Sequence, residues 1–364
     1  MAHYLARRLL LMAPTLLGVL LINFCIVQFA PGGPIERVIA QSVGLGADVT
    51  ARTSGSGSQG LETTGASGST SRYRGAQGLD PVYIAELERQ FGFDKPAHVR
   101  FVQMIGNYAR LDFGNSYYRN APVIELIADK LPVSLSLGFW TVLVTYLVSI
   151  PLGIRKAVRD GSRFDLWTSG MIIVGYAVPS FLFAVFLIVL FAGGSWWQIF
   201  PLRGLVSDNW ADLGWGARIA DYFWHITLPV LSMAIGGFAS LSMLTKNAFL
   251  DEIHKLYVMT ARAKGLTERR VLYGHVFRNA MLVVIASFPA AFTTILFTSS
   301  LLVEVIFSLD GLGLLSFEAV LNRDYPVVFG GLFIFTLLGL LLNLLADIAY
   351  TMVDPRIDFE QRAT

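Results

Sequence analysis

The sequence predicts an all-α membrane protein with six transmembrane helices, and three observations support this fold class. First, 54% of the 364 residues are hydrophobic and only 15% are charged, whereas soluble domains carry about 25% charged residues. Second, six segments without a charged residue are each long enough to cross a bilayer. Third, the basic residues of the short loops gather on one side of these segments. The net charge of +2 indicates no nucleic-acid partner.

The six apolar segments give the predicted spans in order. They are Leu9–Phe29, Leu131–Ile154, Leu166–Leu202, Ile226–Thr245, Ala280–Val303 and Tyr325–Ala346. The third is too long for one span, so we expect it to leave the membrane near Ala192 and to continue along the interface, with Trp196 and Trp197 at headgroup level. Prolines fall within the segments at Pro14, Pro151, Pro179, Pro229 and Pro289. Membrane helices tolerate proline, so these residues do not argue against the six spans.

The distribution of lysine and arginine predicts the orientation of the spans. One side carries Arg7, Arg8, Arg155, Lys156, Arg159, Arg163, Lys246, Lys255, Arg262, Lys264, Arg269, Arg270, Arg278, Arg356 and Arg362, and the short loops of the other side carry only Arg203, Arg218 and Arg323. Because basic loops stay in the cytoplasm, both termini are expected there. A cleaved signal peptide is the alternative for the first segment. Its apolar part would usually be about 7–15 residues, and we favour a retained span because this segment is longer.

A long loop, residues 31–130, lies outside in this topology. Residues 44–78 are rich in Gly, Ser and Thr and are expected to be flexible. Residues 79–130 are expected to be ordered, with Asp80 and Pro81 starting a helix. This ordered part is a small cap on the spans, a surface that meets a delivery protein, or both. The predicted parts are therefore 1–30 with the first span, the periplasmic loop 31–130, the core 131–350 with a cytoplasmic loop at 246–280, and the tail 351–364.

Motifs for bond chemistry are absent from the sequence. There is no G-x-x-x-x-G-K-[ST] phosphate-binding loop, no H-E-x-x-H spacing and only one cysteine, Cys25. Glu304, Asp347 and Lys246 lie at span edges, where we expect them to reach water or headgroups rather than to form a proton relay. We therefore predict no catalytic residue, no metal site and an energy source on a partner.

Two other function classes stay open at this point. An ion-coupled secondary carrier would work without an ATPase, and an intramembrane hydrolase would use residues such as Ser180 or His225. No paired motif supports the hydrolase.

The most informative segment is the polar run at residues 257–280, YVMTARAKGLTERRVLYGHVFRNA, between two predicted spans. A helix is predicted over Asp251–Lys264, with Leu256, Met259, Thr260 and Ala263 on one face. Gly265 should end it, and Thr267 should start a second helix that runs towards the fifth span. Such an element is either a docking helix for a soluble partner or a basic loop that fixes topology.

Thr260–Gly265 (TARAKG), with Arg278–Ala280 downstream, resembles the cytoplasmic EAA loop of ABC importer permeases in its dipeptide/oligopeptide (DppB/OppB-like) form. The general pattern, Glu-Ala-Ala followed after three residues by Gly, falls here on Met259, Thr260, Ala261 and Gly265, so the glutamate and first alanine are replaced. Further matches lie at Phe91–Pro96, Asp112–Ser116, Pro151–Ile154, Pro179–Phe181, Leu228–Pro229, Phe307–Gly313, Arg323–Pro326 and Val353–Arg356.

Within that family the chain looks most like the YejB-type permeases of importers that take up oligopeptides and microcin C. The features that carry this likeness are the Gly/Ser-rich insert before Tyr73–Gly75, together with Gly161–Asp165, Phe200–Val206, His225–Pro229 and Asp354–Glu360.

The resemblance implies a type I ABC importer transmembrane domain in the bacterial inner membrane. It implies a second homologous permease, two ATPase domains that carry ATP and Mg, and a periplasmic peptide-binding protein as partners, with no cofactor on this chain. The ATPase-coupling residues would be Tyr257, Met259, Thr260, Ala261, Arg262, Ala263, Lys264 and Gly265. No substrate-binding residue follows from the sequence.

Overall fold

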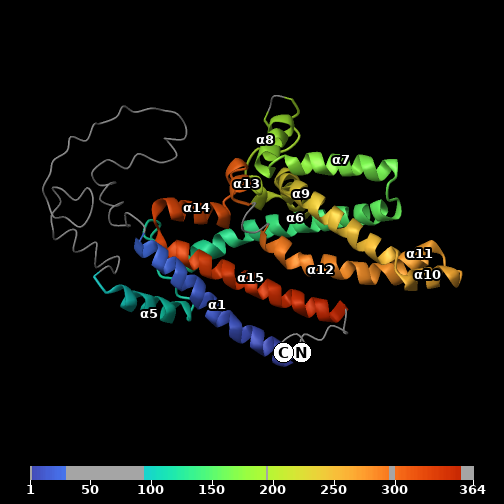
Figure 1. Ribbon diagram of the computed structural model, residues 1–364. Helices are drawn as coiled ribbons and strands as arrows, with labels where there is room; N and C mark the ends of the chain where they lie inside the picture. The colour runs from blue at the N-terminus through green and yellow to red at the C-terminus, as the bar shows by residue number, and fades with distance from the viewer. Residues whose placement is uncertain (1, 30–93, 194–195, 295–299, 354–364) are drawn as a thin grey trace, which may run out of the picture. The chain divides into compact units, whose positions relative to one another are not determined.

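The computed structural model describes residues 2–29, 94–193, 196–294 and 300–353. In these ranges the chain is helical and forms no strand beyond an isolated bridge between Asn115 and Pro122. The α-helices are α1 (Ala2–Phe29), α5 (Ala97–Tyr108), α6 (Val123–Val158), α7 (Arg163–Ala177), α8 (Ser180–Phe191), α9 (Trp215–Ile253), α10 (Leu256–Ala263), α11 (Glu268–Val271), α12 (Phe277–Thr294), α13 (Ser300–Ile306), α14 (Leu312–Asn322) and α15 (Tyr325–Val353) (Figure 1). The predictions for 31–93, including the flexible stretch and the helix at Asp80, lie outside the described residues.

The number of candidate spans is five, or six if α7 and α8 together make one. Five stretches are long and apolar enough to cross a bilayer: Ala6–Ile26, Val123–Val158, Trp215–Ile253, Glu268–Phe288 and Tyr325–Leu345. The helices α7 and α8, with 15 and 12 residues, pass the same test only as a pair, and they are bent by 97° relative to each other. The chain is therefore an all-α, multi-pass membrane protein.

The prolines of the predicted spans differ in their effect: some lie inside a continuous helix, and one breaks the helix at the bend between α7 and α8. Pro151 and Pro229 lie inside α6 and α9, as expected. At Pro179 the helix breaks instead, and Val178 is extended with φ −86° and ψ 119°. The pyrrolidine ring disfavours helical geometry in the preceding residue, which explains the break. The helix does end at Phe191, next to the predicted exit at Ala192.

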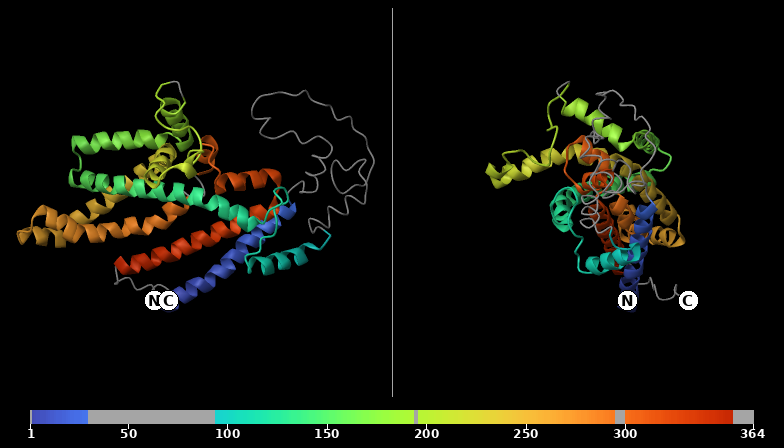
Figure 2. Two further views of the ribbon diagram at one scale, coloured as in Figure 1. Left: turned by 180° about the vertical axis from the view of Figure 1, so that it is seen from behind. Right: turned by 90° about the vertical axis from the view of Figure 1, so that its left-hand side faces the viewer.

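The described chain divides into two compact units, one with residues 1–13, 128–315 and 335–364 and the other with residues 14–127 and 316–334. In the first unit, α9 packs against α12, α8 and α7. From both sides of the ribbon, α9 and α12 converge towards the end that carries α10 and α11 (Figures 1 and 2). The buried cluster at this end, here called the α10 cluster, consists of Ile154, Ala157, Phe249, Val258, Ala261, Val271, Val276 and Ala280.

The second unit is held by aromatic packing and by one carboxylate. Phe24 contacts the rings of Phe101 and Phe329, with centroid distances of 5.2 and 6.4 Å. The Asp324 carboxylate accepts hydrogen bonds from the Ser116 hydroxyl at 2.5 Å and from the Tyr117 N–H at 3.1 Å. These bonds fix the turn after α5 to the start of α15.

Charged residues at the predicted span edges are more deeply enclosed than the sequence suggested. Glu304 is fully buried and accepts hydrogen bonds from the Ser134 hydroxyl (3.0 Å) and the Leu314 N–H (2.8 Å), so the expectation that water reaches it is wrong. These donors lie on the separate helices α6 and α14, 170 and 10 positions from Glu304, which is why the local pattern of its own helix did not predict burial. Asp347 is ion-paired with Arg8.

Lys246 belongs to a buried ionic cluster that joins α6, α7 and α9. Its ammonium lies 2.7 Å from carboxylate oxygens of both Asp160 and Asp165. Lys156, which is fully buried, lies 3.6 Å from Asp165 and donates to the Ser169 hydroxyl at 2.6 Å. Buried charges need such partners because their desolvation is costly. Lys246 is therefore an ion-paired group between helices and does not extend to the interface as a single charge.

Candidate docking element at α10

The helix α10 is separated from α9 by a break of two residues. His254 ends α9 with φ −89° and ψ 0°, and Lys255 is extended with ψ 150°. The prediction of one continuous helix over 251–264 is therefore wrong at these two positions. The break is stabilised locally, since the His254 ring Nδ1 bonds the Leu250 carbonyl at 2.8 Å and Lys255 is ion-paired with Glu252.

Gly265 ends α10, as the sequence predicted. Its φ is +78°, and its N–H donates to the Arg262 carbonyl at 2.9 Å. The N–H of Leu266 donates to the Ala261 carbonyl at 3.3 Å, which completes a Schellman motif. A Cβ added at Gly265 would meet open space, so the backbone conformation, and not crowding, explains the glycine.

The second helix also begins where predicted and leads into the next span. Thr267 precedes α11 with an extended ψ of 146°, and a short π-helix, Leu272–Val276, joins α11 to α12. The loop is thus a folded helical hairpin, with α10 as its outgoing arm.

One face of α10 packs on the chain and the other is open. Val258 is fully buried and Ala261 is 7% exposed, and both belong to the α10 cluster. On the opposite face Leu256 is 81% exposed and Met259 is 56% exposed, and Thr260 and Ala263 are exposed beside them. Burying a side chain such as Val258 stabilises the packing of α10 on the α10 cluster by about 1.5–3 kcal/mol. The periodicity of the sequence placed Leu256, Met259, Thr260 and Ala263 on one face of the helix, and this face is the exposed one.

The predicted coupling residues divide between these two faces. Met259, Thr260, Arg262, Ala263, Lys264 and Gly265 are exposed. Ala261 faces its own chain and contributes by packing, so its side chain is not available to a partner. Tyr257 is half-buried against the same cluster.

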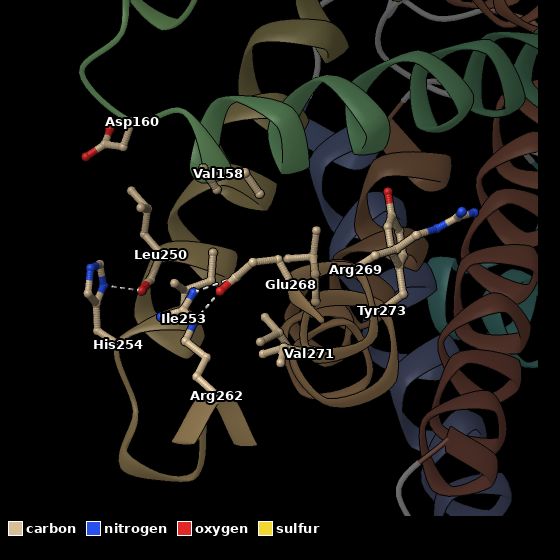
Figure 3. Close-up of a pocket in the computed structure, with 13 residues that line it drawn as sticks. Val158, Asp160, Leu250, Ile253, His254, Arg262, Glu268, Arg269, Val271 and Tyr273 are labelled. Carbon is tan, nitrogen blue, oxygen red and sulfur yellow. Dashed lines mark hydrogen bonds and ion pairs between the residues drawn. The ribbon is translucent and has the colours of Figure 1, made fainter. Parts of the chain in front are cut away.

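An ion pair closes the hairpin across the Gly265 turn. The Arg262 Nε lies 2.9 Å from Glu268 Oε1, and its Nη2 lies 3.1 Å from Oε2 (Figure 3). Bidentate pairs of this kind fix geometry as well as charge. The pair borders a pocket of about 530 Å³, whose walls include Leu250 and Val271.

Two residues of this element, Glu252 and Asn279, were not predicted from the sequence. Glu252 accepts hydrogen bonds from Lys255 and from the Tyr257 hydroxyl, and the Asn279 amide donates to that same hydroxyl. Burial and the bond to Glu252 raise the pKa of Tyr257 above its usual value, which favours the protonated hydroxyl that donates to Glu252. The Arg278–Ala280 motif was the only sequence signal that included Asn279.

The chain is multi-pass and helical, and its helix α10 packs on the chain with one face and exposes apolar side chains on the other. These are features of a membrane subunit that works with a soluble protein. Residues 149–359 match the family described as "Binding-protein-dependent transport system inner membrane component". The chain belongs to this family, as a permease of the YejB type.

The relatives support this assignment along their whole length. The chain is 62% identical to "Peptidoglycan transport system permease protein YejB" of Agrobacterium fabrum and 60% identical to "Inner membrane ABC transporter permease protein YejB" of Escherichia coli O157:H7, with 100% of each chain covered. It is 32% identical to "Oligopeptide transport system permease protein AppB" of Bacillus subtilis, over 99% of this chain and 100% of that protein.

The fold is also similar to that of a solved transporter. A chain of the MetNI methionine ABC transporter, in an inward-facing conformation, matches with a TM-score of 0.50 and 15% sequence identity. The match covers 63% of this chain and 97% of that one. The fold is therefore of the ABC permease kind, as the resemblance implied.

Proposed function

We propose that the chain is a permease subunit that moves oligopeptides inward across the bacterial inner membrane, driven by ATP hydrolysis on partner ATPases. The observation that carries this proposal is α10. It is firmly seated on one face by Val258 and Ala261, and on the other it exposes Leu256 and Met259 next to small residues. Exposed large apolar side chains on a water-facing element indicate a partner surface.

In this proposal α10 is the coupling helix, and it lies in the cytoplasm. The pair α7 and α8 counts as one of six spans, both termini are cytoplasmic, and residues 31–130 form the periplasmic loop. The basic residues around α10, including Lys255, Lys264 and Arg270, favour this side of the membrane. The inward-open and outward-open states of the spans would dock α10 differently on the ATPase. ATP-driven movement of the docked helix would therefore shift the equilibrium between these two states.

The proposed assembly contains a second homologous permease, two ATPase domains, fused or separate, and a periplasmic peptide-binding protein. ATP and Mg would bind the ATPase domains, and this chain would hydrolyse nothing itself. The names of the relatives include oligopeptide, dipeptide and peptidoglycan transport. The proposed substrates are oligopeptides, including peptide antibiotics such as microcin C.

Reconstitution tests the proposal directly. The complete complex in liposomes should import peptide with ATP, whereas this chain alone should import none under a proton gradient. Met259→Glu introduces a charge into the docking face and should lower both ATPase co-purification and uptake at least tenfold. The matched control is Val102→Glu, the same kind of change at a 67% exposed position on α5, and it should leave ATPase co-purification unchanged. Uptake by the chain alone would instead establish an ion-coupled carrier.

A further inference from the structure

One tyrosine hydroxyl joins three helices at the base of the docking element. Tyr257 lies in the first turn of α10, and its hydroxyl donates to Glu252 Oε2 at 2.7 Å, on the last turn of α9. The Asn279 Nδ2, in the first turn of α12, donates to the same hydroxyl oxygen at 3.2 Å. The α10 helix is thus tied by polar contacts to both long helices that carry it.

The polar contacts of Tyr257 fix the orientation of α10, which apolar packing against the α10 cluster alone does not. The α10 cluster holds α10 in place by hydrophobic burial, and hydrophobic burial is non-directional. Hydrogen bonds have a narrow range of lengths and angles and therefore fix orientation. The break at His254 and Lys255 means that no continuous backbone helix transmits movement from α10 to α9.

The position of Tyr257 also separates it from the docking face. Its ring packs against the α10 cluster, while Leu256 and Met259 point to the open side. A partner bound to Leu256 and Met259 would therefore move α10 through a face that does not include Tyr257. The bond to the Glu252 carboxylate is charge-assisted, which makes it the stronger of the two.

We propose that the Tyr257 hydroxyl, held between Glu252 and Asn279, is the positioning group that transmits movement of α10 to α9 and α12. This inference rests on the proposed function, because it assigns the route by which the docked helix acts. Glu252 and Asn279 become coupling residues in this scheme, and Tyr257 becomes a positioning residue and not a docking residue.

Tyr257→Phe tests the inference by removing only the hydroxyl. In the reconstituted complex, ATPase co-purification and ATP hydrolysis should persist, while peptide imported per ATP hydrolysed falls about tenfold, the factor that corresponds to ~1.4 kcal/mol. Asn279→Ala should lower the same ratio and should not add fully to Tyr257→Phe in the double variant, since both remove one bridge. Glu252→Gln keeps an acceptor for the hydroxyl and should retain most of the coupling, whereas Glu252→Ala should not.

The control is Tyr273→Phe, which removes a hydroxyl from the same loop at a 55% exposed side chain that takes no part in this bridge. An unchanged import-to-hydrolysis ratio in both Tyr257→Phe and Asn279→Ala would overturn the inference and leave the proposed function standing if Met259→Glu still fails. If Met259→Glu imports and binds the ATPase normally, the proposed function itself is wrong.

Discussion

Gly265 shows how a single residue determines the shape of the docking element. Its positive φ allows the two backbone hydrogen bonds that close α10, to Arg262 and Ala261. Left-handed geometry costs other residues roughly 1–2 kcal/mol, and asparagine bears it better than alanine. Because open space surrounds the position, the cost comes from the backbone alone.

Gly265→Ala is therefore expected to destabilise the hairpin by about 1 kcal/mol and to lower uptake severalfold, with Gly265→Asn less affected. Amide hydrogen exchange over residues 258–266 measures the first effect, and uptake by the reconstituted complex measures the second. Gly106→Ala, at an open position inside α5, is the control and should be neutral or stabilising. Equal exchange in Gly265→Ala and the wild type would argue against the cap.

Single residues also mark where sequence reasoning succeeded. The end of α10 followed from glycine chemistry, and its open face followed from periodicity. The burial of Glu304 did not follow, because its partners Ser134 and Leu314 lie on other helices. The hydroxyl bridge was missed for the same reason, since Tyr257 and Asn279 are 22 positions apart.

At the scale of elements, α6, α7 and α9 are joined by an ionic cluster rather than by apolar packing alone. Asp165 is its centre, since both Lys156 and Lys246 pair with it. Removing one member of a buried pair leaves the others uncompensated, which is more costly than losing a surface pair.

We expect Asp165→Asn to lower the free energy of unfolding by about 3 kcal/mol, because two lysines lose their shared carboxylate. Asp160→Asn is the matched control: its side chain is 53% exposed, and the loss should be about 1 kcal/mol or less. Thermal unfolding of the detergent-solubilised protein measures both. Similar midpoints for the two variants would show that Asp165 does not hold the cluster together.

Element boundaries were the least predictable part of the fold. The apolar segments predicted most of the long helices, but the break at Pro179 and the break at His254 and Lys255 were missed. A proline inside a span either bends or breaks the helix, and the outcome depends on neighbouring helices that the local sequence does not reveal.

At the scale of the whole molecule, the proposed orientation places α10 and α5 on opposite sides of the membrane. Because Cys25 is the only cysteine, a Cys25→Ser background makes every new thiol unique. In that background Val102→Cys should react with an impermeant thiol reagent in intact spheroplasts. Met259→Cys should react only in inverted vesicles stripped of the ATPase, because the proposed topology places it in the cytoplasm. Both side chains are exposed on the chain itself, so burial should not prevent either reaction. Labelling of Met259→Cys in intact spheroplasts would reverse the topology.

The ionic cluster also has a consequence for how the chain is made. Lys156 and Asp165 lie nine positions apart, at the facing ends of α6 and α7, so a growing chain can pair them as soon as both helices are formed. Lys246 is synthesised about 80 positions later and pairs with a second carboxylate, Asp160, as well as with Asp165. Because both carboxylates precede Lys246 in the chain, its counter-charges are already synthesised when α9 is made, so the cost of burying the lysine charge can be offset at that step.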